Sequence, residues 1–265
     1  MRILIADTET TSLDTSTGFI QELAWAIFDM EKKRLLKSRS HLISWNRAYE
    51  VDQGAYETTG LSREYVERWG TEAKLVFEEF LTDVHDVDAI GGHNYIDFDD
   101  KMLISNIKRA FFSEPAELIA KFKVDTYHDC PYPKSQKIFG LKYLAFDHGH
   151  ILSNAHQALA DVLACAHVFM SYPLKDCLDI ANTPLVTLSG HTQYHDQAGR
   201  EAFYQAKFRW NKPNNRWERR CRAYHIPGTQ LQLGGRQLLS DNTLVPSVPG
   251  PEIETKSFTE SELPF

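Results

Sequence analysis

Short apolar stretches in the first half of the chain have the lengths and residue types of strands. Residues 3–6 are all apolar, which indicates a strand that is buried on both faces. The apolar and aromatic stretches 20–30 and 36–45 follow, so we predict three successive strands arranged as a meander. The apolar run 87–92 predicts a fourth strand, and residues 122–127 are expected to be extended as well.

Other segments have apolar residues spaced three and four positions apart, which is typical of helices packed on a core. The predicted helices cover about 71–84, 98–112, 140–146 and 153–172. Ser153 or Asn154 is expected to cap the last of them. Strands followed by alternating strands and helices predict an α/β protein, in which helices cover a mixed sheet.

The composition changes after Pro173. Residues 200–222 contain eight basic and two acidic residues, a local charge of +6, with aromatic residues between them. The last 25 residues are rich in proline and acidic residues, a composition that favours disorder. We therefore expect a main domain at 1–180, a small basic aromatic module at 185–235 and a disordered acidic tail at 240–265.

The net charge alone does not exclude a polyanionic partner such as nucleic acid. With 36 acidic and 29 basic residues the net charge is −7, which argues against a polyanionic partner. The basic module, with its local charge of +6, instead favours binding of a polyanion in that part of the chain. Four cysteines without a Cys-x-x-Cys pair, no signal-peptide pattern and no long apolar run predict a cytoplasmic protein that does not bind membranes.

Three places along the chain carry carboxylates in patterns that suit catalysis. Asp7 and Glu9 lie two apart at a strand end, so both side chains project from the same face, as cation binding requires. An acidic pair at this position is also common in solvated turns. The apolar run before the pair favours a site, because ligands bind outside the strand ends of α/β sheets.

The second place is the start of the helix after the fourth strand, where Asp97, Asp99 and Asp100 crowd together. Acidic residues there also cap helices, but three exceed what a cap needs. The third place is the last helix, where Asp161 lies among apolar residues and a buried carboxylate requires a partner or a metal ion. His156 precedes it; capping or surface exposure is the alternative for this histidine.

Together these residues suit a pair of divalent ions and a base that titrates near neutrality. The motifs Asp7-Thr-Glu9-Thr-Thr, Asn94-Tyr-Ile-Asp-Phe-Asp99 and His156-Gln-Ala-Leu-Ala-Asp161 resemble those of the DEDD superfamily of 3′-to-5′ exonucleases, histidine subtype, over about residues 1–172. Asp97 would replace Asp99 if the second motif had a shorter spacing. The resemblance implies a ribonuclease H-like mixed five-stranded sheet flanked by helices, plus the small C-terminal appendage and the disordered tail.

The resemblance also implies a reaction. Four carboxylates, Asp7, Glu9, Asp99 and Asp161, would hold two Mg²⁺ or Mn²⁺ ions, and His156 would be the general base. Water would then release 5′-mononucleotides from the free 3′ end of single-stranded DNA. A 3′-to-5′ exoribonuclease and a non-catalytic adaptor built on an exonuclease fold are the alternatives.

Substrate contacts are implied in the same way. The residues at positions that contact nucleic acid in the family are Thr10, Leu13, Gly60, Leu61, His93, Asn94 and Phe98. Two positions depart from the family pattern: Thr59 replaces a histidine near the 3′-end pocket, and Ser12 replaces a glycine after the first motif.

The basic module and the tail suggest further partners. Arg209, Trp210, Arg216 and Trp217 are candidate nucleic-acid contacts, because cations can bind phosphates while aromatic rings stack on bases. The alternative is a small hairpin with both tryptophans packed inside. The segment Glu260-Ser-Glu-Leu-Pro-Phe265 resembles the acidic tip of bacterial single-stranded DNA-binding proteins, and Glu262-Leu263-Pro264-Phe265 would be its docking residues. It predicts docking onto proteins that bind such tips, in DNA replication or repair. The alternatives are a tail that folds back onto the basic site of this protein and a tail that is only solvated.

Overall fold

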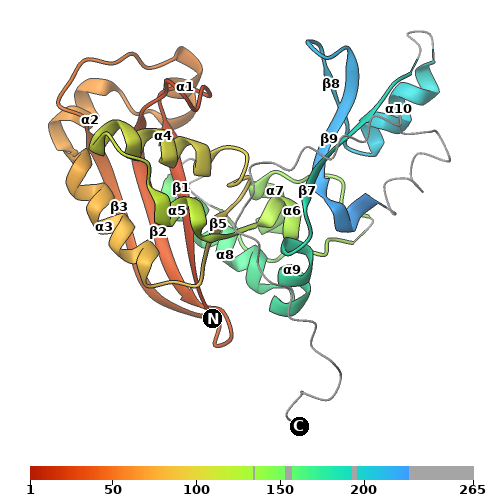
Figure 1. The fold of residues 1–265 in the computed structure, drawn as a ribbon, viewed down its shortest axis with the longest axis horizontal. Coiled ribbons are helices and arrows are strands. Elements are labelled where there is room, and N and C mark those ends of the chain that lie inside the picture. Colours follow the sequence, from red (N-terminus) through yellow and green to blue (C-terminus); the bar gives the residue numbers. More distant parts are fainter. Residues whose placement is uncertain (134, 153–156, 193–195, 227–265) are drawn as a thin grey trace.

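The structure is a computed structural model, and it describes residues 1–133, 135–152, 157–192 and 196–226. Its centre is a six-stranded mixed sheet with the strand order β4-β3-β2-β1-β5-β6 (Figure 1). The strands are β1 (Arg2–Thr10), β2 (Ile20–Asp29), β3 (Arg34–Ser44), β4 (Thr71–Glu72), β5 (Ala89–Gly92) and β6 (Phe122–Asp125). The predicted mixed α/β architecture is confirmed.

The first three strands form the predicted antiparallel meander, since β2 pairs with β1 on one side and with β3 on the other. β5 and β6 then extend the sheet in parallel from β1. The carboxyl ends of β1, β5 and β6 therefore meet at one edge of the sheet. This edge receives the residues that follow each of the three strands.

The sixth strand, β4, corrects the predicted count of five. Two residues at the start of the predicted helix, Thr71 and Glu72, pair in parallel with Ile43 and Ser44 of β3. The close approach depends on Gly70, where a Cβ atom would lie 2.7 Å from the Ser44 nitrogen. A strand of two residues has no periodicity, so the apolar pattern could not predict it.

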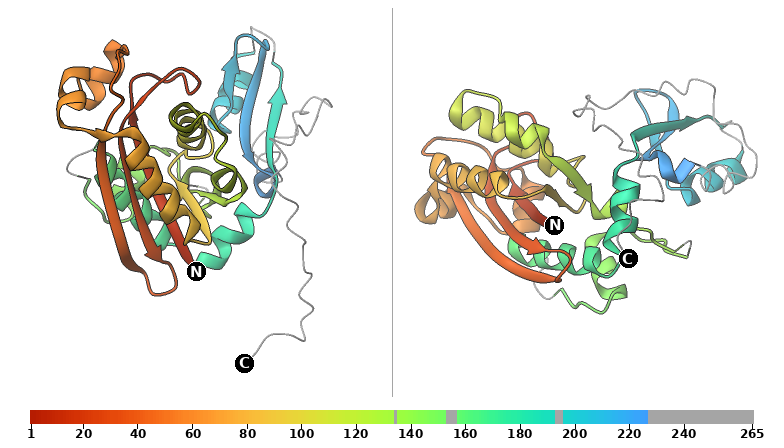
Figure 2. Two further views of the ribbon diagram at one scale, coloured as in Figure 1. Left: turned by 60° about the vertical axis from the view of Figure 1, so that its left-hand side comes forward. Right: turned by 60° about the horizontal axis from the view of Figure 1, so that its bottom comes forward.

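Helices cover both faces of the sheet, as Figures 1 and 2 show. The helices of this part are α1 (Gln53–Thr59), α2 (Arg63–Trp69), α3 (Ala73–His85), α4 (Asp99–Phe111), α5 (Ala116–Ala120), α6 (Thr126–Asp129), α7 (Leu141–Asp147), α8 (Ala158–Met170) and α9 (Leu174–Ala181). Helix α8 begins at Ala158 with Gln157 at its N-cap, so the expected cap at Ser153 or Asn154 is wrong.

The alternation of side chains along β1 divides the core into two layers. Leu4 and Ala6 pack with α3 and α4 on one face. Ile3 and Ile5 pack with α8 and α9 on the other. The same alternation continues into the polar end of β1, and it decides which helix each polar side chain faces.

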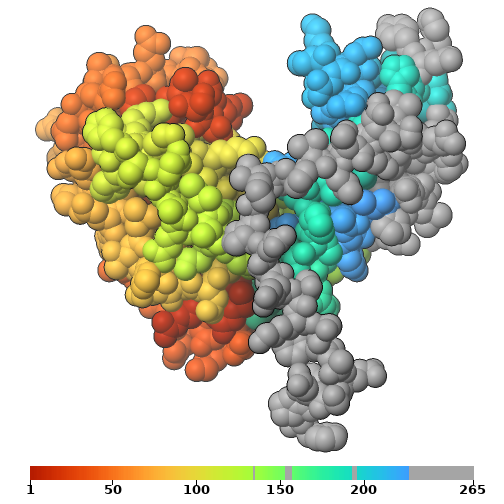
Figure 3. Space-filling model, viewed as in Figure 1, coloured from red at the N-terminus to blue at the C-terminus, as the bar shows by residue number. Residues whose placement is uncertain are grey.

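The C-terminal module, residues 185–226, has its own three-stranded sheet in the order β7-β9-β8. Its elements are β7 (Leu185–Gly190), α10 (Gln197–Gln205), β8 (Arg209–Asn211), β9 (Arg216–Arg222) and the 3₁₀ turn η1 (Ala223–His225). A separate apolar cluster around Phe203 and Phe208 holds it together. In the space-filling view the module, in cyan and blue, projects beside the larger part (Figure 3). The division into domains at 1–180 and 185–235 stays a prediction.

Strand β9 docks the module onto α6 through buried polar contacts. Arg222 Nε donates to Asp129 Oδ1 at 2.7 Å, and Asp129 is fully buried. Arg220 forms an ion pair with Asp97, and His225 Nε2 lies 2.9 Å from the His128 carbonyl oxygen. Two of the eight basic residues of the module are therefore structural.

Some predictions fall on residues that the structure does not describe. His156, the tail 240–265 and the segment Glu262–Phe265 lie outside the described residues. Their predicted roles stay predictions from the sequence. Within the described ranges, no helix combines the length and the apolar character needed to cross a membrane.

We expect Arg222→Met to destabilise the protein. It leaves the Asp129 carboxylate buried without its cation, and breaking a buried pair from one side costs about 3–5 kcal/mol. Urea denaturation measures this loss. Lys175→Met is the control, because Lys175 pairs with Asp179 at the surface, and it should leave stability nearly unchanged. Equal losses in the two variants would contradict the docking role of Arg222.

Candidate active site

Three carboxylates meet at the polar end of β1. Asp7 and Glu9 follow Ile3 and Ile5 at alternate positions, so their side chains face α8. Asp161 lies in the first turn of α8. One ligand oxygen from each of the three residues lies within 4.8 Å of the others. The structure thus brings together three of the four predicted metal-binding carboxylates.

Burial makes this cluster electrostatically unfavourable. Glu9 is 8% exposed, and burial together with the nearby charges of Asp161 and Glu22 raises its pKa to about 8. Burial also raises the pKa of Asp7 well above its usual range, and the neighbouring Asp99 and Asp161 add to the effect. Carboxylates this close repel each other unless protons or cations neutralise them.

The donor set fits hard divalent cations. All three donors are carboxylate oxygens, which Mg²⁺ and Mn²⁺ prefer over softer ligands. A buried group of like charges requires compensation, and a divalent ion supplies it without a proton. Asp7, Glu9 and Asp161 are therefore the residues that would hold such an ion.

Asp99 lies beside this cluster and is held by the opposite face of β1. Thr8 faces α4, and its backbone N and its Oγ1 both donate to Asp99 Oδ1, at 3.0 and 2.6 Å. Burial raises the pKa of Asp99 to about 7, although the bonds from Thr8 lower it. Asp99 is absent from the three-carboxylate group, but its charge raises the pKa of Asp7.

The alternative carboxylate, Asp97, has other contacts. It forms ion pairs with Arg220 and Lys101, and its Oδ2 lies 3.2 Å from His128 Nε2. Asp99 and Asp100 lie in the first turn of α4, where acidic residues also favour the helix dipole. Among these three acidic residues, Asp99 is the one bonded to β1.

A residue that the sequence analysis missed holds the loop 93–98. Asp125, at the end of β6, accepts bonds from the backbone nitrogens of Asn94 and Ile96, at 2.8 and 3.1 Å. Its own nitrogen donates to Asp129, the partner of Arg222. A signal was present in the sequence, since Asp125 follows the short extended segment from Phe122 much as Asp7 follows the apolar run 3–6.

This network fixes the predicted contacts of the second motif. His93 Nδ1 lies 2.9 Å from Thr126 Oγ1, and burial lowers the pKa of His93 to about 4, so the ring is neutral at pH 7. Asn94 adopts a left-handed φ of 58°, and Phe98 is the N-cap residue of α4.

The contacts predicted around the first motif gather at the opposite side of β1. Thr10 is buried, and its Oγ1 donates to the Ser12 carbonyl oxygen, whereas Leu13 is 86% exposed. Gly60 ends α1 with a left-handed φ of 71°, and the Leu61 carbonyl accepts a bond from Gln21 of β2. The structure thus brings Gly60 and Leu61 next to the sheet.

The candidate nucleic-acid contacts in the module differ in exposure and in their partners. Trp217 stacks on Phe203 with 5.9 Å between ring centroids, and Arg216 pairs with Glu218. Trp210 contacts Trp217 edge to face and is 43% exposed. The packed hairpin, the alternative for this segment, therefore describes Trp217 well.

Comparison with known proteins identifies the family. The fold is a mixed α/β sheet with a carboxylate site at the end of its central strand. The family model RNase T, described as exonuclease, matches residues 4–169. The chain therefore belongs to this exonuclease family, whose members are phosphodiester hydrolases. The predicted resemblance to the DEDD 3′-to-5′ exonucleases is confirmed.

Solved structures agree on the fold. A structure of exonuclease I is 19% identical, with a TM-score of 0.59, over 71% of this chain and 48% of that protein. E. coli exonuclease I in complex with a dA16 oligonucleotide has a TM-score of 0.56 at the same identity and coverage. This chain therefore covers about half the length of those proteins. A search of curated proteins found no match.

We expect divalent ions to stabilise the protein more at pH 8.5 than at pH 6. In the metal-free folded protein Glu9 keeps its proton up to about pH 8, whereas the unfolded chain loses it near its ordinary value of 4.5. Stability in EDTA should therefore fall as pH rises between these values. Metal ions bind the deprotonated carboxylates, so their effect should increase over the same interval.

The rise in Tm on adding Mn²⁺, measured at both pH values, tests this expectation. Glu9→Gln removes one ligand and one charge, so its Tm in EDTA at pH 8.5 should exceed that of the wild type while its response to Mn²⁺ shrinks. A Mn²⁺ effect that is the same at both pH values would contradict the assignment.

Proposed function

We propose that this protein is a metal-dependent 3′-to-5′ exonuclease that removes 5′-mononucleotides from single-stranded DNA. The observation that carries the proposal is the close group of half-buried Asp7, buried Glu9 and half-buried Asp161 in a chain of an exonuclease family. A hydrolase of phosphodiesters must neutralise a substrate anion, and a cation-binding site of this kind is suited to that task.

Asp7, Glu9, Asp99 and Asp161 would hold two divalent ions, Mg²⁺ or Mn²⁺. When bound, such ions polarise the phosphoryl oxygens and activate water as a nucleophile. The contribution of the chain is to orient the carboxylates. Thr8 fixes Asp99 through two bonds, and the rigid β1 strand fixes Asp7 and Glu9.

His156 would accept the proton of the attacking water. It precedes Asp161 by five residues, so the same segment supplies both a metal ligand and the general base. An ordinary histidine pKa of about 6.5 suits this role at neutral pH.

Single-stranded DNA is the substrate that the comparisons favour. Structures of E. coli exonuclease I contain dA16 and dT13 oligonucleotides. The exposed Leu13, which follows the first motif, and the loop 93–98, which precedes Asp99, would contact the terminal nucleotides. Release of nucleotides from RNA instead of DNA would favour the exoribonuclease alternative.

Asp7→Asn should lower kcat more than about 100-fold, because a bound metal ion lowers the activation barrier by several kcal/mol and each ~1.4 kcal/mol is a factor of ten in rate. Mononucleotide release from matched 3′- and 5′-labelled DNA and RNA strands, with Mg²⁺, Mn²⁺ or EDTA, measures this effect. Asp88→Asn, at the opposite end of the sheet, is the control and should keep wild-type activity. Release from the 5′ end, or activity in EDTA, would contradict the proposed function.

His156→Ala should lower kcat by about 10²–10⁴-fold, the usual contribution of a general base. The variant should still respond to Mn²⁺ in thermal denaturation, since the carboxylates are intact. Wild-type rates in this variant would show that His156 is not the base.

A further inference from the structure

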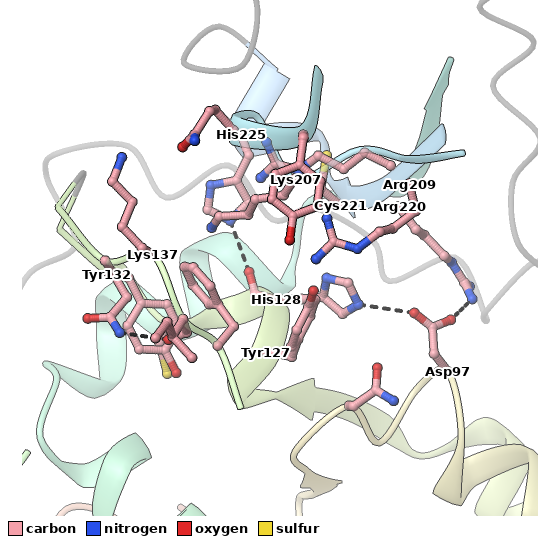
Figure 4. Close-up of a pocket in the computed structure, with 18 of the residues that line it drawn as sticks. Asp97, Tyr127, His128, Tyr132, Lys137, Lys207, Arg209, Arg220, Cys221 and His225 are labelled. Atoms are coloured by element: carbon pink, nitrogen blue, oxygen red, sulfur yellow. Dashed lines mark hydrogen bonds and ion pairs between the residues drawn. The ribbon is translucent and has the colours of Figure 1, made fainter. Parts of the chain in front are cut away.

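Beside the contacts that dock the C-terminal module onto α6, a cleft of about 950 Å³ lies between the module and the loops around α6 (Figure 4). A second cavity of about 680 Å³ shares Asn94, Tyr127, Phe139 and Lys207 with it, so the two form one continuous groove. The first cavity alone reaches the upper end of the ~300–1,000 Å³ typical of small-ligand pockets. The groove therefore has room for a ligand larger than one nucleotide.

The charge of the cleft is positive after its internal pairs are counted. Its acidic residues are already engaged: Asp97 pairs with Arg220, and Glu218 accepts bonds from Arg216 and two asparagines. In the part of the chain that the structure describes, the cleft residues Lys137, Lys207 and Arg209 form no ion pair with a carboxylate. Among the described residues, these three basic side chains are therefore without a carboxylate partner and open to an anionic ligand.

Lys207 is a partly buried lysine whose charge no carboxylate of the described residues neutralises. It follows α10 with a left-handed φ of 67°, and its Nζ lies 3.2 Å from the centroid of the Phe139 ring. Burial lowers the pKa of this lysine to about 7, because the charged form loses hydration without gaining a carboxylate. A bound phosphate would favour the charged form.

Aromatic rings alternate with these cations. Tyr204 is 57% exposed, and the Arg209 guanidinium lies 5.0 Å from its ring centroid. Tyr127 and Phe139 line the opposite wall, which Figure 4 shows for Tyr127. Cations for phosphates and rings for unpaired bases are the combination that binds single strands without sequence preference.

The cleft is connected along the chain to the second carboxylate motif. Asn94 and Asp97, which line it, belong to the loop that leads to Asp99. We propose that this cleft binds the unpaired strand behind its 3′ end, with Lys137 and Lys207 contacting phosphates and Tyr204 stacking on a base. The proposal rests on the proposed exonuclease function, and it assigns the C-terminal module to holding the substrate.

The test is the binding of single-stranded DNA by the double variant Lys137→Gln/Lys207→Gln. Binding of a labelled dT12 strand is measured in EDTA, where no cleavage occurs, across a series of salt concentrations. Each lost phosphate contact lowers the salt slope by about 0.7, so we expect a decrease of about 1.4 and about 25-fold weaker binding at 0.1 M salt. Binding of the dinucleotide dT2 should weaken less than threefold.

Lys142→Gln/Lys212→Gln is the matched control. It removes the same charge from α7 and from the β8–β9 hairpin, at two exposed lysines outside the cleft. Lys137→Gln alone, at an exposed side chain that puts folding at little risk, should lower the slope by about 0.7.

Two results would overturn the proposal. One is a salt slope for the cleft variant equal to that of the control. The other is an equal loss for dT12 and dT2, which would place the defect at the active site. Nucleotide release by the wild type is measured separately. If the wild type releases no nucleotide, the exonuclease function fails, whatever the binding experiment shows.

Discussion

Mutual repulsion among closely spaced carboxylates, one of them buried and two half-buried, is the constraint on which this structure depends. Asp7 and Glu9 face Asp161 within 4.8 Å, and burial raises the pKa of both strand residues. A fold tolerates such a group only when something neutralises it. The rigid central strand keeps the carboxylates together, and the alternation of its side chains sends Thr8 to the other face, where it anchors Asp99. The repulsion thus lowers the stability of the metal-free protein at the place where a cation would bind.

The C-terminal module is joined to this site through polar contacts. Arg222 binds Asp129, Asp129 binds the backbone of Asp125, and Asp125 holds the loop that leads to Asp99. The positive charge of the module therefore divides into two functions. Some arginines dock the module onto the α/β part, and other cations remain in the cleft, where a phosphate backbone could replace the missing carboxylates.

The sequence predicted most of the fold and the carboxylates of the site, because both follow from short-range patterns. Sequence patterns located five of the six strands of the main sheet, and the spacing of Asp7 and Glu9, together with Asp161 in an apolar helix, indicated a cation site. Strand β4 was missed because two residues have no period. The partners of Arg220 and Arg222 were missed because Asp97 and Asp129 lie about a hundred residues away, and pairing at that range depends on tertiary packing. The net charge of −7 gave no indication of the basic cleft, because a sum over the whole chain does not show where basic residues cluster.

The account requires that the carboxylates Asp7, Glu9 and Asp161 bind divalent ions. Titration of the protein with Mn²⁺, followed by electron paramagnetic resonance of the free ion, counts the bound ions directly. We expect two Mn²⁺ per wild-type chain, and weaker binding with fewer ions for Asp161→Asn. If the wild type and Asp161→Asn bound the same number of ions with the same affinity, the site would not be a metal centre, and the account would be wrong.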